Sequence, residues 1–247
     1  MKHIVIFGGT TEGRELAEAL AGKPLFLTVC VATEYGREEQ GELPGVEVHS
    51  GRLDAAAMAV LLKGTDLCVD ATHPYAKEVS KNIRSACASS GTPYRRLLRK
   101  ASPLPESAVM VDSAKAAAEY LKDKPGNVLL TTGSKELASY EGLERQRLFP
   151  RVLPLLESLQ LCEAAEIPHK NILALQGPFS RELNEAIIRQ YGICWLVTKD
   201  GGAAGGFAEK VEAAENTGAR LVVIARPEET GQDFETVLRE CEDLLWK

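Results

Sequence analysis

Short apolar runs alternate with longer amphipathic stretches along the chain, and this alternation restricts the fold more than any other feature of the sequence. In the first part of the chain, the runs that we expect to be strands are residues 3–7, 26–32, 46–49, 67–70 and 94–98. Between them lie stretches whose apolar residues have helical spacing, at residues 12–21, 54–62 and 75–89. Strands and helices that alternate in this way predict βαβ units and a parallel sheet.

The alternation is interrupted at residues 101–107, where two prolines and two serines indicate a linker. Beyond it we expect strands at residues 128–131, 147–152, 172–175, 194–198 and 220–225. The helices expected there are residues 113–122, 154–165, 181–191, 207–217 and 233–246. The sequence therefore predicts an α/β protein with two Rossmann-like, doubly wound parallel-sheet domains, at residues 1–100 and 108–247, and an active site in the cleft between them. A chain of 247 residues is long enough for two such domains.

The composition, with 45% hydrophobic and 26% charged residues, is that of a soluble globular protein. No apolar run approaches the roughly 20 residues of a membrane-spanning helix, so we expect no membrane partner. The N-terminal apolar run is too short for a signal peptide, and we expect a cytoplasmic protein. The net charge of −6 argues against nucleic acid as a partner. Basic side chains nevertheless cluster locally, at Arg95, Arg96, Arg99 and Lys100 and again at Arg145, Arg147 and Arg151.

Neither the cysteines nor the histidines form a metal-binding pattern. The six cysteines include no C-x-x-C pair, and the four histidines show no ligand spacing with them, so we expect no metal site. Cys30, Cys68 and Cys194 lie in apolar runs, where we expect buried, reduced thiols.

The first predicted strand runs directly into a glycine-rich turn, and helical spacing begins immediately after it. The turn reads Gly8-Gly9-Thr10-Thr11-Glu12-Gly13-Arg14. Glycine lets a backbone turn sharply and approach a ligand, and the unpaired N–H groups of a helix start favour a phosphate. The threonine hydroxyls and the Arg14 cation would add donors. The spacing departs from G-x-G-x-x-G by one residue, so the turn predicts a dinucleotide phosphate site, with a plain βα turn as the alternative.

The turns after the second and third predicted strands are candidates for the same dinucleotide. Glu34 is the acidic residue expected to bind a ribose, whereas Thr33 and Arg37 would instead accept a 2′-phosphate, which leaves NADPH and NADH open. The turn after the third strand is Ser50-Gly51-Arg52. The carboxyl ends of strands line the ligand crevice of a doubly wound sheet, so we expect this turn to contact the dinucleotide, with an ordinary N-capped turn as the alternative.

The fourth predicted strand ends in a segment crowded with polar and aromatic side chains, Asp70-Ala71-Thr72-His73-Pro74-Tyr75-Ala76. Pro74 fixes the backbone near a helix start, with Thr72 as the N-cap or its neighbour. Capping does not explain His73 and Tyr75. A histidine donates a proton or a hydrogen bond near neutral pH, and we expect His73 or Tyr75 to be the catalytic proton donor. A packed surface histidine is the alternative.

Three strand ends in the second part of the chain repeat the sequence of strand, turn and helix. The three turns begin with Thr131-Thr132-Gly133-Ser134, with Gln176-Gly177-Pro178-Phe179-Ser180, and with Lys199-Asp200-Gly201-Gly202. The last continues to Gly205 and Gly206, and so many glycines are costly to order without a ligand. For each turn, a βα connection without a ligand is the alternative.

Together these segments resemble the precorrin-6A reductase family of cobalamin biosynthesis, including its cobalt-precorrin form. The matching segments are the opening glycine turn, Asp70 to Ala76, Gly177 to Ser180 with Asn184, and Thr198-Lys199-Asp200 with the glycines that follow, and they occur in the family's order. The resemblance covers nearly the whole length. The family often has serine where this chain has Gly201, which puts any hydroxyl contact at that position in doubt.

The resemblance implies an oxidoreductase that transfers a hydride from NADPH, with NADH as the alternative, to a double bond of precorrin-6A or its cobalt form. With the strand-end turns described above, it leads us to expect a cofactor site at Gly8 to Arg14, Thr33, Ser50, Gly51, Arg52, Asp70, Ala71 and Thr72. The substrate-binding residues that we expect are Thr132, Gly177, Ser180, Asn184, Lys199, Asp200 and Gly205. Lys199 is a second candidate proton donor. The clustered arginines suit the carboxylates of a tetrapyrrole substrate. We expect a monomer or a homodimer.

Other functions stay open from the sequence alone. One is a different nicotinamide-dependent reductase, such as a short-chain type, which a Tyr-x-x-x-Lys pair would mark. Another is a dinucleotide-binding sensor without catalysis, which the glycine turns do not exclude. A third is a tetrapyrrole methyltransferase, whose cofactor would be S-adenosylmethionine.

Overall fold

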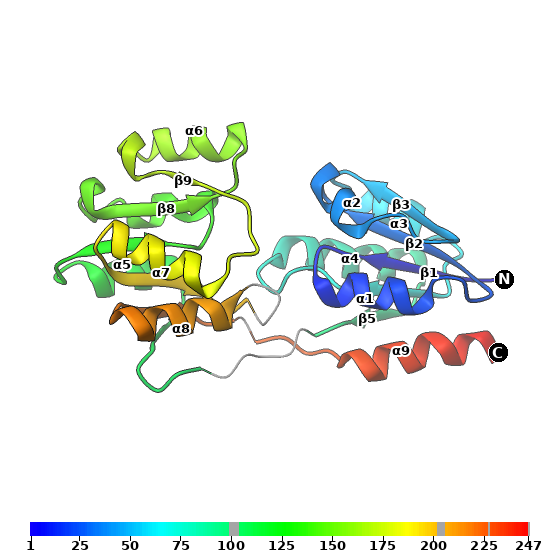
Figure 1. Cartoon of the computed structure of the whole chain (residues 1–247). Coiled ribbons are helices and arrows are strands. Elements are labelled where there is room, and N and C mark those ends of the chain that lie inside the picture. Colours follow the sequence, from blue (N-terminus) through cyan, green and yellow to red (C-terminus); the bar gives the residue numbers. More distant parts are fainter. Residues whose placement is uncertain (99–103, 202–205, 227, 247) are drawn as a thin grey trace. The chain divides into compact units, whose positions relative to one another are not determined.

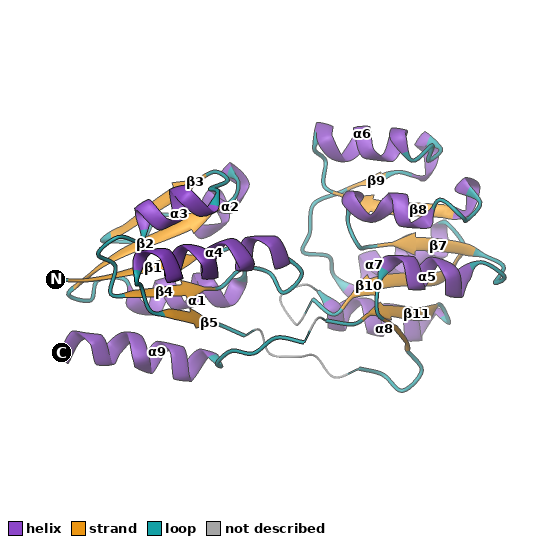
Figure 2. Ribbon diagram, turned by 180° about the vertical axis from the view of Figure 1, so that it is seen from behind, coloured by secondary structure: helices purple, strands orange, loops and turns teal. Residues whose placement is uncertain are grey.

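The computed structural model of this chain describes residues 1–98, 104–201, 206–226 and 228–246 (Figure 1). They form two compact units, of which the first comprises Met1–Lys100 and Pro227–Lys247 and the second Ala101–Arg226. Figure 2 shows that each unit is a sheet with helices packed on it. The strands of both sheets pair in parallel throughout the part of the chain that is described. The predicted fold class, two Rossmann-like parallel-sheet domains, is confirmed.

The sheet of the first unit has the strand order β3-β2-β1-β4-β5. Its strands are β1 (Lys2–Phe7), β2 (Leu25–Val31), β3 (Val46–Ser50), β4 (Leu67–Asp70) and β5 (Tyr94–Arg96). Its helices are α1 (Thr11–Leu20), α2 (Glu34–Gln40), α3 (Ala55–Leu61), α4 (Lys77–Ser90) and α9 (Phe234–Asp243), followed by the 3-10 turn η5 (Leu244–Trp246).

Both faces of this sheet are covered, which explains why its central strands are apolar throughout. On β1, Ile4 and Ile6 belong to a core that includes α1 and α9, whereas Val5 and Phe7 belong to a core that includes α3 and α4. Successive side chains of a strand point to opposite faces, so a strand buried on both faces shows no alternation of polarity. None of these four side chains is more than 3% exposed.

The end of the chain packs in the first unit, which differs from the expected domain at residues 108–247. The segment before α9 runs beside β5, where Leu98 N donates to Gln232 O and Gln232 N donates to Arg96 O, each over 2.8 Å. Helix α9 then packs Val237 and Cys241 into the core that contains α1 (Figure 1). The predicted linker at residues 101–107 lies partly outside the described residues.

The sheet of the second unit has the order β6-β11-β10-β7-β8-β9. Its strands are β6 (Val109–Val111), β7 (Asn127–Leu130), β8 (Leu148–Val152), β9 (Leu173–Ala174), β10 (Ile193–Lys199) and β11 (Arg220–Ile224). Its α-helices are α5 (Ala114–Leu121), α6 (Leu156–Ala164), α7 (Arg181–Gln190) and α8 (Phe207–Thr217). Its 3-10 turns are η1 (Ser134–Tyr140), η2 (Arg145–Arg147) and η3 (His169–Asn171). Helices α7 and α8 share one apolar core with β7, β8, β10 and β11.

The strand order reverses between β1 and β4 in the first sheet and between β7 and β10 in the second. A doubly wound sheet binds its ligand outside the carboxyl ends of the strands at such a switch point. The opening glycine turn and the segment after Asp70 lie at the first of these points, and Thr132 and Lys199 lie at the second. The topology therefore brings the opening glycine turn close to the segment after Asp70 in the first unit, and Thr132 close to Lys199 in the second.

Some local expectations were wrong. The sequence did not predict α2 or β6, which have seven and three residues and too few positions for a clear period. Cys194 is exposed rather than buried, because it lies at the amino end of β10 beside Gly126, which has no side chain to cover the thiol. Cys30 and Cys68 are buried and free, as expected.

Candidate functional site

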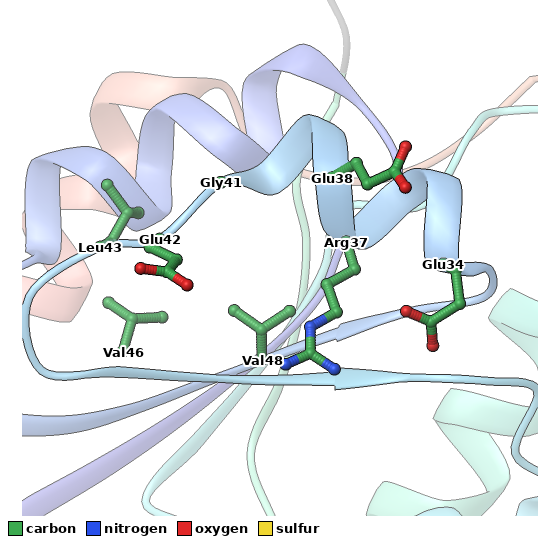
Figure 3. Close-up of a pocket in the computed structure, with 8 residues that line it drawn as sticks. All are labelled: Glu34, Arg37, Glu38, Gly41, Glu42, Leu43, Val46 and Val48. Atoms are coloured by element: carbon green, nitrogen blue, oxygen red, sulfur yellow. The ribbon is translucent and has the colours of Figure 1, made fainter.

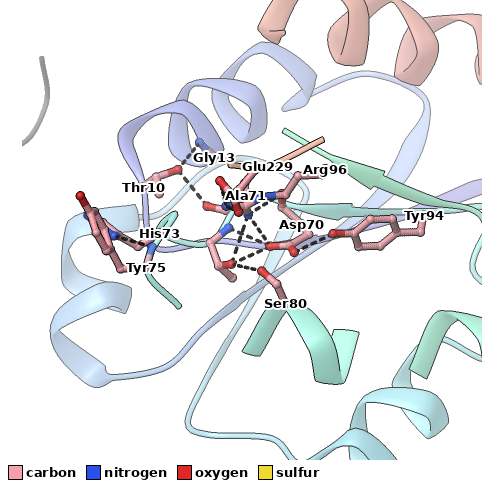
Figure 4. A network of polar contacts seen from close by, with 11 residues as sticks. Thr10, Gly13, Asp70, Ala71, His73, Tyr75, Ser80, Tyr94, Arg96 and Glu229 are labelled. Carbon is pink, nitrogen blue, oxygen red and sulfur yellow. Dashed lines mark hydrogen bonds and ion pairs between the residues drawn. The ribbon is translucent and has the colours of Figure 1, made fainter. Parts of the chain in front are cut away.

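Thr10 holds the turn after β1 against the end of β4. It is the N-cap of α1, where its Oγ1 accepts a hydrogen bond from Gly13 N over 3.2 Å. The same hydroxyl donates to Ala71 O over 2.8 Å (Figure 4). One side chain thus satisfies an unpaired donor of the helix start and joins the two turns of the switch point.

The glycines of this turn differ in how strongly the fold requires glycine at their positions. Gly9 has a φ of +119°, which residues with a side chain rarely adopt. A Cβ at Gly13 would lie 2.8 Å from the Cβ of Ala71, so α1 approaches the end of β4 only because no side chain intervenes. A Cβ at Gly8 would meet Val29 at an ordinary 3.5 Å. The packing of the protein itself therefore does not require glycine at position 8.

The remaining residues of the predicted phosphate turn begin α1. Thr11 and Glu12 lie in its first turn and are partly exposed. Arg14 Nη1 donates to Glu39 O over 3.3 Å and lies 3.8 Å from the Glu39 carboxylate. The Arg14 guanidinium therefore contacts the end of α2 rather than the glycine turn.

Asp70 is fully buried at the end of β4, and both of its carboxylate oxygens accept hydrogen bonds (Figure 4). Oδ1 accepts from the Thr72 hydroxyl over 2.7 Å and from Arg96 Nη1 over 2.8 Å, and Oδ2 accepts from Tyr94 OH over 2.9 Å. Burial and the nearby Asp70 charge raise the pKa of Tyr94, so its hydroxyl remains a donor. Arg96 also pairs with Glu229 over 2.9 Å. The carboxylate thus ties the turn after β4 to β5.

Thr72 is part of this network and is not a helix cap. The N-cap of α4 is Ala76, which makes no side-chain cap hydrogen bond. The Thr72 hydroxyl instead lies between Asp70 and Ser80, with its oxygen 3.1 Å from Ser80 Oγ. The segment from Thr72 to Ala76 is therefore an ordered loop between β4 and α4.

His73 and Tyr75 form a ring pair in that loop (Figure 4). Their ring centroids are 5.5 Å apart, and Tyr75 N donates to His73 Nδ1 over a long 3.4 Å. A neutral imidazole that accepts at Nδ1 carries its proton at Nε2. Both side chains are partly exposed, so the structure brings together two groups that are able to donate a proton.

The turns after β2 and β3 meet through their side chains. Thr33 is the N-cap of α2 and accepts from Gly36 N over 3.0 Å. The Ser50 hydroxyl donates to the Glu34 carboxylate. Gly51 N donates to Val31 O over 2.9 Å, and Arg52 is exposed. The candidate residues at these two strand ends therefore lie together.

A hollow of about 630 Å³ lies beside this turn (Figure 3). Its lining residues are Glu34, Arg37, Glu38, Gly41, Glu42, Leu43, Val46 and Val48. Figure 3 shows that Glu34 and Arg37 point from α2 towards β3. The sequence offered these two side chains as alternative partners of a ribose or a 2′-phosphate, and the structure presents both.

At the switch point of the second unit, Lys199 ends β10, and its Nζ lies 2.7 Å from Glu136 in η1, the turn after β7. Asp200 is buried, and its Oδ1 lies 3.3 Å from Arg226 Nη2. Thr132 is buried at the end of β7. Gly205 lies outside the described residues.

The third motif of the second unit surrounds a buried arginine. Ser180 caps α7, and Asn184 in its first turn is fully buried. Asn184 Nδ2 donates to Ser180 O over 2.9 Å, and its Oδ1 accepts from Arg151 Nη1 over 2.7 Å. The Phe179 ring lies 3.9 Å from the Arg151 guanidinium, and a Cβ at Gly177 would collide with that ring at 2.9 Å. Gly177, Ser180 and Asn184 therefore hold Phe179 and Arg151 in place.

The described residues contain no group of three or more histidine, cysteine, aspartate or glutamate side chains that would hold a metal ion. No helix in the described part of the chain is long and apolar enough to cross a membrane.

A model of the family described as precorrin-6x reductase CbiJ/CobK matches residues 3–242. The chain belongs to this family. A cobalt-precorrin-6A reductase of Priestia megaterium is 36% identical over 231 residues, which cover 91% of this chain and 90% of the relative. A precorrin-6A reductase of Rhodococcus erythropolis is 32% identical, covering 92% of this chain and 90% of the relative. A solved structure described as CobK precorrin-6A reductase shares the fold, with a TM-score of 0.77 and 24% identity, and covers 98% of this chain and 97% of its own.

Membership of the precorrin-6x reductase family makes the chain an oxidoreductase, as the sequence predicted. A reductase with Rossmann-like domains indicates a nicotinamide cofactor. The sequence placed Phe179 in the turn before α7 without a role of its own, and it did not indicate Lys210; the structure places the Phe179 ring against Arg151. An aromatic residue in a loop and a lysine in an amphipathic helix carry no local signal of such a role.

Proposed function

We propose that this oxidoreductase reduces one double bond of precorrin-6A or of cobalt-precorrin-6A, with NADPH as the hydride donor. The observation that carries the proposal is the hydrogen bond from Thr10 to Ala71, in a chain of the precorrin-6x reductase family. It joins the glycine turn after β1 to the loop after β4 at the switch point where doubly wound sheets bind dinucleotides.

The first unit is our candidate for the cofactor. The start of α1 presents backbone N–H groups beside a turn in which Gly8 and Gly9 carry no side chains, and these features fit a diphosphate. Bound there, the nicotinamide dinucleotide supplies the hydride. The residues proposed to hold it are Gly8, Gly9, Thr10, Thr11, Glu12, Gly13, Arg14, Thr33, Ser50, Gly51, Arg52, Asp70, Ala71 and Thr72. Among them, Asp70 acts by shaping the loop, because its carboxylate is buried and already bonded.

The second unit is our candidate for the tetrapyrrole. Its proposed substrate-binding residues are Thr132, Gly177, Ser180, Asn184, Lys199, Asp200 and Gly205. The support for this assignment is their position after β7, β9 and β10, at the carboxyl ends of parallel strands.

Hydride addition to a conjugated double bond builds negative charge that a proton must neutralise. We propose His73 or Tyr75 as the donor, because both are partly exposed in the loop after β4 and because an imidazolium or a phenol has a proton to donate. Lys199 is the second candidate. The test is turnover and NADPH affinity of His73→Ala, Tyr75→Phe and Lys199→Ala. If all three kept normal turnover, solvent or the substrate's own ring nitrogens would be the donor.

The function itself is tested by titration of the purified chain with NADPH and NADH in parallel. Anaerobic turnover on metal-free and on cobalt-containing precorrin-6A follows, with loss of the reduced-nicotinamide absorbance as the readout. We expect oxidation of the cofactor only when a precorrin is present. Binding without oxidation would instead support a sensor, and preferential binding of S-adenosylmethionine would support a methyltransferase.

The structure disfavours a short-chain type of reductase. Tyr120 and Lys124 do have Tyr-x-x-x-Lys spacing. They lie where α5 ends and β7 has not yet begun, at the amino ends of the strands, and Lys124 Nζ stacks 4.4 Å from the Tyr120 ring. That pair is therefore remote from the carboxyl ends, where a parallel sheet binds its ligand.

A further inference from the structure

Most of the clustered arginines already have strong partners. Arg95 pairs with Glu240, and Arg96 pairs with Asp70 and Glu229. Arg145 donates to the carbonyl oxygens of residues 140, 141 and 143, and Arg147 to those of residues 124 and 126. Four of the basic residues that the sequence indicated as partners of substrate carboxylates therefore bind groups of the protein itself.

Arg151 is different because it is buried without an anion. It is 6% exposed, and its contacts are the Asn184 amide at 2.7 Å and the Phe179 ring at 3.9 Å. Among the described residues, no carboxylate lies within ion-pair distance of its guanidinium. Buried charges in proteins are usually paired, because removal from water is costly unless an opposite charge compensates for it.

A second buried cation lies close to the first. Lys210, in the first turn of α8, is 8% exposed. Burial, with a smaller contribution from the charge of Arg151 that Glu209 opposes, lowers the pKa of Lys210 to about 8, so the two cations are near enough to repel each other. An anion between them would remove this repulsion.

The surrounding backbone also favours an anion. Phe149 and Arg151 are alternate residues of β8, and Phe149 packs in the core shared with α7 and α8, so Arg151 projects towards the same helices. In a parallel α/β unit, helices start at the carboxyl ends of the strands. Arg151 therefore lies near the starts of α7 and α8, where the helix dipoles are positive. The N-cap of α8 is Gly206, which makes no side-chain cap hydrogen bond.

We propose that Arg151 and Lys210 bind a carboxylate of the substrate, with Asn184 and Phe179 as the residues that position Arg151. The proposal rests on the proposed function for its choice of ligand, since a precorrin carries acetate and propionate side chains. A carboxylate accepts two parallel hydrogen bonds from a guanidinium, and the ammonium group adds a further donor.

The rim of this site suits the rest of such a ligand. Leu153 follows β8 by one residue and is 42% exposed, and Leu175 follows β9 by one residue and is 40% exposed. Leu175 N donates to Val152 O over 3.0 Å, which keeps these two strand ends together. A macrocycle with an apolar ring and peripheral carboxylates matches exposed leucines beside buried cations.

The test compares the wild type with Arg151→Met and Lys210→Met. Methionine keeps much of the side-chain volume and removes the charge, so both variants are expected to fold, which circular dichroism checks. The matched control is Arg189→Met, which removes an exposed arginine of α7. The probe is uroporphyrin, a tetrapyrrole with acetate and propionate side chains, titrated by quenching of its fluorescence. The KM for the precorrin and the NADPH dissociation constant are measured in parallel.

We expect each methionine variant to bind uroporphyrin about tenfold more weakly or worse and to raise KM similarly, with NADPH affinity unchanged, because a charged hydrogen bond is lost. The Arg189→Met control should match the wild type. Wild-type binding and KM in both methionine variants would overturn the carboxylate site, whether or not the chain reduces a precorrin. If the methionine variants bind uroporphyrin more weakly but the wild type reduces no precorrin, the carboxylate site is supported and the proposed function is rejected.

Discussion

Thr10 and Ala71 are 61 residues apart in the sequence, and the hydroxyl of the first donates to the carbonyl oxygen of the second over 2.8 Å. The bond fixes the spacing between the turn after β1 and the loop after β4. Because Thr10 also caps α1, its side chain links the helix start to the loop. The proposed phosphate site and the loop that carries His73 and Tyr75 are thus joined by one hydroxyl group.

Thr10→Val should therefore weaken both the fold and the cofactor site. Valine keeps the shape and loses the hydroxyl, so we expect the free energy of unfolding to fall by about 1–2 kcal/mol. We expect NADPH affinity to fall about tenfold, because the helix start is no longer held. Denaturant unfolding and NADPH titration measure the two effects. Ser113→Ala removes the N-cap of α5 in the second unit and should lower stability without changing NADPH affinity.

Gly8→Ala and Gly13→Ala should separate ligand approach from protein packing. Gly8 is not among the residues with positive φ, and a Cβ there meets only ordinary contacts, so stability should change by less than about 1 kcal/mol. NADPH binding should nevertheless weaken, because a side chain at position 8 leaves a diphosphate less room to approach the backbone of this turn. At Gly13 the methyl group would collide with Ala71, and overpacking should lower stability by about 1–3 kcal/mol. A Gly8→Ala variant that binds NADPH as tightly as the wild type would remove the phosphate site from this turn.

The sequence predicted features that depend on neighbouring residues better than features that depend on distant ones. The strand β1, its glycine turn and α1 follow from a short apolar run, a capping threonine and helical spacing. The sequence predicts α9 equally well as a helix, but an amphipathic face does not say which sheet it covers. Only the long-range packing of Val237 and Cys241 places α9 in the first unit. For the same reason the domain boundary differed from the expected one.

The candidate site shows the same division. The sequence indicated Asp70 as the end of a strand and Arg96 as part of a basic cluster, and only the structure pairs them with each other at 2.8 Å. Arg145, Arg147 and Arg151 are equivalent in the sequence, because each is a basic residue in one short segment. Two of them donate to backbone carbonyls, and the third is buried beside an amide and a ring. Burial and partners are properties of the fold, so spacing alone does not distinguish these arginines.

Arg37→Gln tests the choice between NADPH and NADH. Arg37 lines the hollow beside α2 together with Glu34, whose carboxylate already accepts a hydrogen bond from Ser50 (Figure 3). If Arg37 binds a 2′-phosphate, its loss should weaken NADPH about tenfold and leave NADH unchanged. Parallel titrations measure the ratio of the two dissociation constants. Arg239→Gln on α9 is the control for the loss of one exposed arginine. An unchanged ratio in Arg37→Gln would assign the selectivity to another residue.

Lys210 should make the free energy of unfolding rise with pH, whereas a lysine in an ordinary ion pair makes it fall as the pH rises. Burial, with a smaller effect of Arg151 that Glu209 opposes, lowers its pKa from 10.5 to about 8. Below pH 8 the lysine is protonated in both the folded and the unfolded state, and the folded state carries the full cost of the buried charge. Between pH 8 and 10.5 the folded state releases the proton and the unfolded state keeps it, so its contribution to stability rises with pH.

We therefore expect the stability of the wild type, relative to Lys210→Met, to increase by about 3 kcal/mol across this range, because one pKa unit corresponds to about 1.4 kcal/mol. Denaturant unfolding of both proteins at a series of pH values measures the difference, in which groups common to both cancel. Lys115→Met removes an exposed lysine of α5 and controls for the loss of one charge. Bound uroporphyrin should move the rise to higher pH, because a carboxylate beside Lys210 favours the ammonium form. A difference that stays constant with pH would mean that Lys210 is not a buried cation.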